Sequence, residues 1–402
     1  MLTKFRFSDT FCAFYTFCTF YTHYILVERE GDWFVDTVSV SCVCRYLYIG
    51  HEEEDMDDSV LTIYGGGCES CESISEVLER KREVVSKIYL RYNKIGDENA
   101  VKYLFPALCR VSNLLELDLA GNEISDVSCE SLASALGDKV TIRVMNLESN
   151  KLCRGMSILS APMSKMKQMR VLNLCRNKID HKSARDLAFA LKLMPRLVEL
   201  RLDENCFGKA GTHSILKSLG DGEHKVLEIL GLGRVGIGSG NSEKDHQPCC
   251  WYEGMKALRS LKELNLSGNK LGPDGARDLV SIFSDVSQWK TLSKLDLSVN
   301  DFFAEGAKIL STTIENSMSR FESLIHINLA WNWFEPAGFE AIKNTFRTFQ
   351  GLEYLNLCGN KFQDDHKTYL RNQYEKRIGN SGSNSSTSIG GRDKDANGEL
   401  IL

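Results

Sequence analysis

The sequence predicts an α/β solenoid of about ten repeats, a curved horseshoe with parallel strands on its concave face and helices on its convex face. The first observation is the motif L-x-x-L-x-L-x-x-N-x-L, which recurs ten times between residues 85 and 362. The second is its period, since neighbouring motif asparagines lie 27 to 32 residues apart both from Asn93 to Asn205 and from Asn269 to Asn360. The third is the helical spacing of apolar residues between copies, as in residues 180–191 and 272–283.

Each copy predicts one short strand followed by a turn. Leucines alternate with variable residues in the strand, so the leucines face the core and the variable residues face the concave surface. The asparagine turns the chain out of the strand, and its amide is expected to bond the backbone of the adjacent turn, forming a ladder along the stack. The ladder residues are Asn93, Asn122, Asn150, Asn177, Asn205, Asn269, Asn300, Asn332 and Asn360, and the sixth copy has Val235 instead.

The chain divides into four predicted segments. Residues 1–56 are an N-terminal segment of uncertain order that ends in an acidic linker, and residues 57–84 form an N-terminal cap. Residues 85–378 are the repeat domain, and residues 379–402 are a disordered tail rich in Gly, Ser and Asn. Ser73 and Glu76 fit a capping box that opens a helix running to about Val84. Residues 364–378 predict the last helix.

The amino end predicts no membrane segment. Residues 10–27 carry no formal charge, but they are rich in Thr and Tyr and poor in aliphatic residues. A spanning helix needs about 20 predominantly apolar residues, and a signal peptide needs an aliphatic core. The composition therefore argues against membrane or secretory targeting, which is kept as the alternative interpretation of this segment. The 14 cysteines show no compact framework, which indicates free thiols and a cytoplasmic location.

The copy at 261–271 and the segment after it carry the most specific family resemblance. They match N-x-L-G-x-x-G-A-x-x-L through Asn269, Leu271, Gly272, Gly275, Ala276 and Leu279. Residues 85 to about 376 thus resemble leucine-rich repeats of the ribonuclease-inhibitor type. Proteins with such repeats include enzyme inhibitors, sensor arms of innate-immune receptors, ciliary regulatory subunits and actin regulators. The resemblance implies a protein-binding role.

Two tryptophans, Trp331 and Trp333, flank the ladder residue Asn332. In most other copies these two positions hold Gly, charged or small residues, so they are expected to face solvent at the strand-to-helix edge. Exposed aromatic residues on a rigid rim are typical binding anchors, and packing of Trp333 on Phe334 or Pro336 is the alternative. Further predicted partner-binding residues are His326 and Tyr354 on neighbouring concave positions, Arg176, Arg201, Asp203 and Glu204 in a central charged strip, and Tyr89 and Tyr92 at the amino end.

No catalytic residue, metal site or cofactor is predicted. The G-x-G-x-x-G at 231–236 is followed by loop residues instead of the helix that a dinucleotide fingerprint needs. Neither the pair Cys68 and Cys71 nor the loop with His246, Cys249 and Cys250 has a second ligand pair at zinc spacing. The net charge of -5 provides no basic surplus for nucleic-acid binding.

The predicted function is a non-catalytic scaffold or regulatory subunit that binds a protein partner of unknown identity through the concave face and the rim. The alternative is a GTPase-activating protein that resembles the Ran GTPase activator, with a small GTPase as partner. That family uses the same repeat type and acts from the strand-to-helix edge. It typically carries a long acidic stretch after the repeats, whereas residues 379–402 hold only three acidic side chains.

Overall fold

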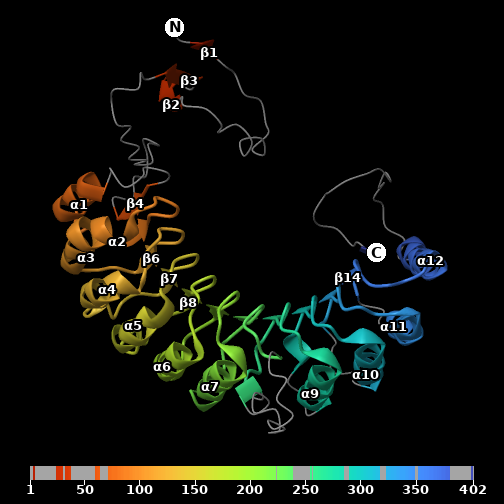
Figure 1. The fold of residues 1–402 in the computed structure, drawn as a ribbon. Helices are drawn as coiled ribbons and strands as arrows, with labels where there is room; N and C mark the ends of the chain where they lie inside the picture. The colour runs from red at the N-terminus through yellow and green to blue at the C-terminus, as the bar shows by residue number, and fades with distance from the viewer. Residues whose placement is uncertain are drawn as a thin grey trace.

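The computed structural model confirms the predicted α/β solenoid. In Figure 1 parallel strands line the inside of an open arc and helices cover its outside. Among the described residues, no helix is long and apolar enough to cross a membrane. The structure describes residues 3–4, 24–29, 32–37, 59–63, 71–222, 224–238, 254–255, 257–284, 289–316, 323–348, 352–380 and 400–401.

The strands of the arc pair in parallel in sequence order, and the ten predicted copies supply β5 to β14. Central residues pair with one another, as Leu264 does with Leu295. One further strand lies at each end of this sheet, β4 beside β5 and β15 beside β14. The bounds are β4 (Val60–Thr62), β5 (Lys87–Tyr89), β6 (Glu116–Asp118), β7 (Val144–Asn146), β8 (Val171–Asn173), β9 (Glu199–Arg201), β10 (Ile229–Gly231), β11 (Glu263–Asn265), β12 (Lys294–Asp296), β13 (His326–Asn328), β14 (Tyr354–Asn356) and β15 (Leu400–Ile401).

Parts of the two terminal segments fall among the described residues. In the N-terminal segment, β1 (Thr3–Lys4), β2 (Tyr24–Arg29) and β3 (Asp32–Thr37) form a separate antiparallel sheet. The acidic linker lies outside the described residues. In the predicted tail only the end of the last helix and β15 are described, so the order predicted for both segments stays a prediction.

Helices follow most of the strands on the outside of the arc. Asp180 begins α6 because its carboxylate accepts hydrogen bonds from the backbone N–H groups of Lys182 and Ser183 at 3.1 and 2.9 Å. The helices are α1 (Cys71–Arg80), α2 (Gly96–Asn99), α3 (Phe105–Arg110), α4 (Cys129–Leu136), α5 (Met156–Met163), α6 (His181–Lys192), α7 (Gly208–Asp221), α9 (Gly272–Ser284), α10 (Phe303–Asn316), α11 (Pro336–Thr348) and α12 (Asp364–Asn380), with a π-helical turn at Ala100–Leu104.

The predicted capping box at Ser73 was wrong. The helix α1 already begins at Cys71 and ends at Arg80, so Ser73 lies inside the helix. Cys71, Ile74 and Leu78 are its buried residues, at spacings of three and four. Burial of this apolar stripe places the first turn upstream of the position that the capping pattern indicates. The last helix begins at Asp364, as predicted.

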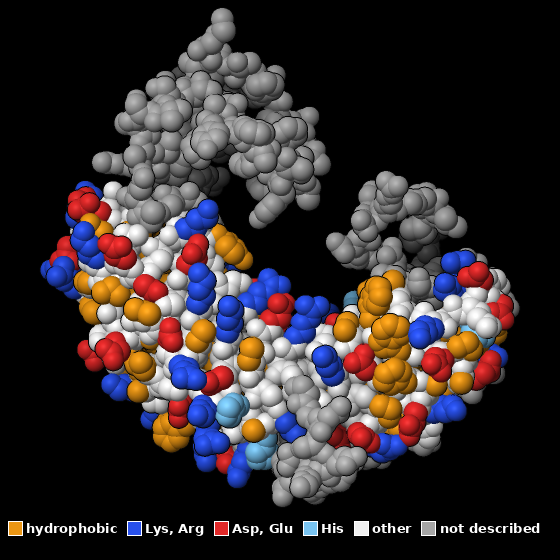
Figure 2. Space-filling model, in the orientation of Figure 1, with side chains coloured by type: hydrophobic (Ala, Val, Ile, Leu, Met, Phe, Trp, Pro, Cys, Tyr) orange, Lys and Arg blue, Asp and Glu red, His pale blue; other side chains and the backbone are white. Residues whose placement is uncertain are grey.

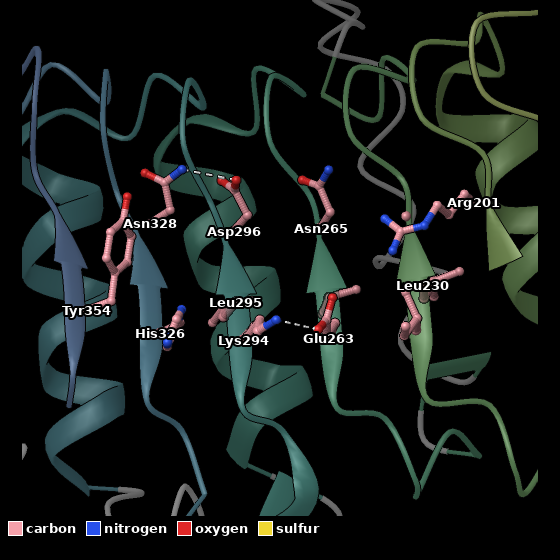
Figure 3. Close-up of a pocket in the computed structure, with 13 residues that line it drawn as sticks. Arg201, Leu230, Glu263, Asn265, Lys294, Leu295, Asp296, His326, Asn328 and Tyr354 are labelled. Atoms are coloured by element: carbon pink, nitrogen blue, oxygen red, sulfur yellow. Dashed lines mark hydrogen bonds and ion pairs between the residues drawn. The ribbon is translucent and has the colours of Figure 1, made fainter. Parts of the chain in front are cut away.

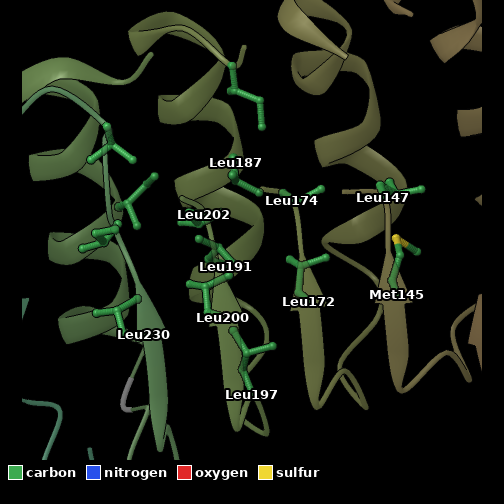
Figure 4. Close-up of a cluster of buried hydrophobic side chains, with 14 of the residues drawn as sticks. Met145, Leu147, Leu172, Leu174, Leu187, Leu191, Leu197, Leu200, Leu202 and Leu230 are labelled. Atoms are coloured by element: carbon green, nitrogen blue, oxygen red, sulfur yellow. The ribbon is translucent and has the colours of Figure 1, made fainter. Parts of the chain in front are cut away.

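The leucines of the repeat form one continuous core. Leu172 and Leu200 from two strands lie against Leu187 and Leu191 of α6, and all four are fully buried (Figure 4). Burying one such side chain contributes about 1.5–3 kcal/mol. Each copy covers the leucines of its neighbour, so the core runs along the whole arc instead of closing within a copy.

The asparagine ladder is confirmed, and Asn332 illustrates its geometry. The side-chain amide of Asn332 donates to the carbonyls of Leu297 and Leu329 at 2.9 and 3.0 Å. Its oxygen accepts a hydrogen bond from the backbone N–H of Asn300 at 2.8 Å. The side chain thereby satisfies buried backbone groups of two copies where the chain leaves the strand.

His224 is a buried histidine that predicts a pH-dependent stability. Burial lowers the pKa of its imidazole, and the backbone of Leu191 has a smaller, opposite effect on that pKa. A base with a lowered folded-state pKa binds fewer protons when folded than when unfolded. Stability is therefore complete above the ordinary pKa of 6.5 and falls as the pH drops below it.

We expect the urea midpoint of the wild-type protein to fall between pH 7.5 and pH 5.5. The variant His224→Gln should show a smaller fall, because its side chain does not titrate there. His181→Gln, at an exposed position of α6, is the matched control and should behave as wild type. An equal fall in His224→Gln and wild type would contradict the assignment.

Candidate functional site

The residue before the ladder position has a left-handed backbone in every copy, and the residue after it does so in most copies. The angle φ is +57° at Arg176, +55° at Lys178 and +56° at Glu204. Glycine adopts this conformation freely, whereas residues with a side chain adopt it at a cost of about 1–2 kcal/mol. Gly121, Gly268 and Gly359 hold the first of these positions in other copies. The glycines therefore reflect backbone conformation as well as exposure.

Four apolar residues occupy left-handed positions in two adjacent copies, and we call them the rim patch. They are Val299, Phe303, Trp331 and Trp333, with φ between +55° and +58° and exposed fractions of 39, 45, 56 and 45%. A left-handed conformation is an outlier for bulky or β-branched residues. Figure 2 shows apolar side chains gathered on this arm of the horseshoe.

Backbone hydrogen bonds bring the members of the rim patch together. The N–H of Val299 donates to the carbonyl of Ala330 at 2.8 Å, next to Trp331. The N–H of Phe303 donates to the carbonyl of Asn332 at 3.0 Å, between the two tryptophans. The rim patch is thus one surface on two neighbouring copies.

Each tryptophan of the rim patch rests on the following copy. A Cβ added to Gly359 would overlap the indole of Trp331, so that ring lies directly over the glycine. The ammonium of Lys361 lies 4.8 Å from the ring centroid of Trp333, a cation–π contact. The ring of Phe334, by contrast, is fully buried and stacks on Phe362. The outer parts of both indoles remain accessible to solvent.

The strain in the rim patch makes a stability prediction. We expect Val299→Gly to raise the free energy of unfolding by about 1 kcal/mol, because glycine adopts φ of +57° without the steric cost of a β-branched residue. Urea denaturation measures the difference. Val127→Gly is the matched control, since Val127 is exposed without a positive φ and should lose stability. A loss in both variants would show that Val299 is not strained.

A groove of about 320 Å³ crosses the concave face from β9 to β14 (Figure 3). Lys294 and Glu263 form an ion pair of 2.7 Å in one row of its side chains. His326 and Tyr354 stack in the same row with ring centroids 5.4 Å apart. Arg201 lies at the far end, where its Nε donates to Glu199. The groove therefore unites three predicted residues, His326, Tyr354 and Arg201.

A column of Asn and Asp at the last strand position stabilises the concave face, and our sequence reasoning missed it. Each side-chain oxygen accepts the N–H of the residue two positions later, as Asn265 does from Ser267 at 2.9 Å. The recurrence at one motif position was the available signal. The column consists of Asp118, Asn146, Asn173, Asn265, Asp296, Asn328 and Asn356.

In the sixth copy the column position holds Gly231, which has no side-chain acceptor. The carboxylate of Asp203 in the fifth copy accepts the hydrogen bond from the residue two positions later instead. One oxygen of Asp203 accepts hydrogen bonds from the N–H of Gly233 at 2.7 Å and from the amide of Asn265 at 2.8 Å. A Cβ on Gly231 would overlap the other carboxylate oxygen. The carboxylate of Asp203 is thus engaged within the protein, and its contact with a partner stays a prediction.

The other predicted residues lie apart from the rim patch. Arg176 and Glu204 form an ion pair of 3.0 Å on the rim of the middle copies. Tyr89 donates to Glu116 on β6, and Tyr92 is 61% exposed, both at the opposite end of the arc (Figure 1). The predicted set therefore comprises several separate surfaces of one long concave side.

Metal-binding clusters are absent from the described residues, and three of the described cysteines are disfavoured as nucleophiles. No group of three His, Cys, Asp or Glu side chains among them could hold a metal ion. Burial raises the pKa of the Cys129 thiol to about 12 and also raises the pKa of Cys153 and Cys175, which disfavours their thiolates. Cys68, His246, Cys249 and Cys250 lie outside the described residues.

Comparisons with known proteins agree with this geometry. The family model described as Leucine Rich repeat matches residues 112–133 and 254–280. The ribonuclease inhibitor of Sus scrofa is 28% identical over 291 residues, 70% of this chain and 58% of that protein. This chain is a leucine-rich repeat protein of the ribonuclease-inhibitor-like type.

Two further relatives align with parts of this chain. The ribonuclease inhibitor of Mus musculus is 25% identical over 63% of this chain and 60% of its own length. The human NACHT, LRR and PYD domains-containing protein 13 is 26% identical over 52% of this chain and 20% of its own length. This leucine-rich repeat chain thus spans less than two thirds of each of these relatives.

Proposed function

We propose that this leucine-rich repeat protein is a non-catalytic scaffold or regulatory subunit that holds a protein partner through the rim patch and the concave groove. The observation that carries the proposal is the rim patch itself. Four exposed apolar residues occupy backbone positions that glycine would fill with less strain. Strain of this kind clusters at binding sites, where the surrounding fold maintains it.

The chemistry of the surface fits a protein partner. Tryptophan, tyrosine and arginine dominate binding energy at protein interfaces. Trp331 and Trp333 supply rigid apolar area, and Arg201 and Tyr354 supply polar edges in the adjoining groove. Two of the relatives are named as inhibitors of a ribonuclease, which supports a protein as the ligand class. Seven described cysteines are free thiols, which supports the proposed cytoplasmic location.

The test is affinity capture by the full chain from cells that express it. The double variant Trp331→Ala, Trp333→Ala is compared with wild type and with Phe189→Ala, which removes an exposed aromatic side chain of helix α6 on the outside of the arc. We expect wild type and Phe189→Ala to recover the same partner. The double variant should bind it at least about 30-fold more weakly, since one hot-spot residue contributes about 2 kcal/mol or more.

All three proteins must first melt at the same temperature, so that folding does not differ between them. Equal partner recovery by the double variant would refute the role of the tryptophans as anchors. A small GTPase as the recovered partner would support the GTPase-activating alternative, and an assay of GTP hydrolysis would then decide it.

A further inference from the structure

The asparagine ladder is interrupted at one step, between the fifth and sixth copies. In the step before, the oxygen of Asn205 accepts hydrogen bonds from the N–H groups of Asn177 and Ile179 at 3.2 and 3.0 Å. The sixth copy has Val235 at the ladder position, and valine has no such oxygen. The N–H groups of Asn205 and Phe207 therefore have no hydrogen-bond acceptor in the described structure, although both residues are buried.

The sixth copy is well joined to the copy that follows it. The oxygen of Asn269 accepts hydrogen bonds from the N–H groups of Val235, Gly236 and Ile237 at 3.0, 3.0 and 3.3 Å. The ladder thus consists of two continuous stretches. The first runs from Asn93 to Asn205, and the second runs from Val235 to Asn360.

The two stretches remain connected on the concave side of the break. The strands β9 and β10 pair in register, with Leu200 opposite Leu230. The carboxylate of Asp203 accepts from Gly233 at 2.7 Å and from Asn265 at 2.8 Å, which links the fifth copy to the sixth and seventh. The N–H of Gly208 also donates to the carbonyl of Val235 at 2.8 Å. The junction is therefore held by backbone hydrogen bonds and by Asp203, and it lacks only the side-chain amide link of the ladder.

We propose that the horseshoe flexes at this junction, with two stiff arcs that pivot about the contacts of Asp203. When the junction opens, a buried N–H without an acceptor gains a hydrogen bond to water, which lowers the free energy of opening. An intact step instead loses hydrogen bonds when it opens. No other ladder step between Asn93 and Asn360 lacks an amide link in the described structure. The step from Asn150 to Asn177 is weaker than the others, with an acceptor bond of 3.5 Å, but it keeps the donor bond to Leu147 at 2.8 Å. The flexion is thus greatest at the step between Asn205 and Val235.

The junction lies between the surfaces that we assign to binding. Arg176, Arg201 and Glu204 belong to the first arc, whereas the rim patch and the His326–Tyr354 end of the groove belong to the second. A pivot would change the separation between Arg201 and the rest of the groove. The inference rests on the ladder alone, so it holds whether or not the rim patch binds a partner.

Amide hydrogen exchange of the full chain, resolved to single residues, tests the inference within one molecule. We expect the amides of Asn205 and Phe207 to exchange about tenfold or more faster than those of Asn177 and Ile179 at the intact step. Val235→Asn would complete the ladder and should make the exchange rates of the two amide pairs similar. Val235→Thr has nearly the same size but no carboxamide, and it should leave the difference unchanged.

A distance measurement tests the pivot itself. Spin labels on noncanonical residues at the exposed positions Glu130 and Glu340 report across the junction, and labels at Glu130 and Arg185 report within the first arc. We expect the distance distribution of the pair across the junction to be broader than that of the pair within the first arc. Val235→Asn should narrow the distribution across the junction. Equal protection of the two amide pairs in the wild-type protein, or equal widths for the two label pairs, would overturn the proposal. Both comparisons remain decisive if Val235→Asn fails to fold.

Discussion

Replacing Asn332 with alanine is expected to lower the free energy of unfolding by about 3–5 kcal/mol. The side chain of Asn332 is fully buried and makes four hydrogen bonds to backbone groups, three as donor and one as acceptor. Alanine leaves those groups buried without partners, and each costs about 1–3 kcal/mol. Urea denaturation of Asn332→Ala measures the loss.

Asn360→Ala is the matched control for this substitution. Asn360 makes the same kind of bonds, to Leu329 and Leu357 as donor and from Asn332 and Phe334 as acceptor. It is only partly buried, because it is the last residue of the ladder. Water can therefore satisfy part of what alanine exposes. The loss should be clearly smaller, and an equal loss in both variants would contradict burial as the cause.

Replacing Gly231 with alanine is expected to lower the free energy of unfolding by about 2–4 kcal/mol, the second large effect. Gly231 has no positive φ, so alanine brings no backbone strain there. Its Cβ would instead overlap the carboxylate of Asp203 and displace it from the N–H of Gly233 and the amide of Asn265. The cost is the loss of two hydrogen bonds to a charged acceptor.

A double-mutant cycle separates this cause from a general loss of packing. In the background of Asp203→Ala there is no carboxylate to displace, so Gly231→Ala should then cost less than about 1 kcal/mol. The free energies come from urea denaturation of the four proteins at one pH. If Gly231→Ala costs the same in both backgrounds, Asp203 is not the group that requires the glycine.

The sequence was sufficient for the architecture because its two strongest patterns report burial directly. Leucines at alternate positions, such as Leu264 and Leu266, are buried because the strand presents them to the core. The ladder asparagines are conspicuous because a buried amide is needed wherever the chain leaves the strand. The leucines recur in ten copies and the asparagine in nine, so an isolated departure such as Val235 does not obscure the patterns.

The backbone conformation of the rim could not be predicted from residue type alone. Arg176, Lys178 and Val299 have no preference for a left-handed φ, and the fold imposes it on them. The glycines Gly121 and Gly359 were the visible signal, and our interpretation of them as solvent-exposed positions captured only part of their meaning. The role of Asp203 depends on two glycines in another copy, which no pattern within a single copy contains.

At three copy boundaries a rim side chain lies over the rim residue of the following copy, so these contacts run in one direction along the arc. Tyr92 lies over Gly121, Arg234 over Gly268, and Trp331 over Gly359, in each case from one copy onto the next. At these three boundaries the bulky rim residue lies over a glycine, and the two residues form a unit that spans the boundary between two copies. Moving a single copy to another place in the chain would separate the two residues of such a unit. The indole of Trp331, for example, would lose its packing contact with Gly359. Recombination of this solenoid, natural or engineered, would have to keep the two copies at each of these three boundaries together.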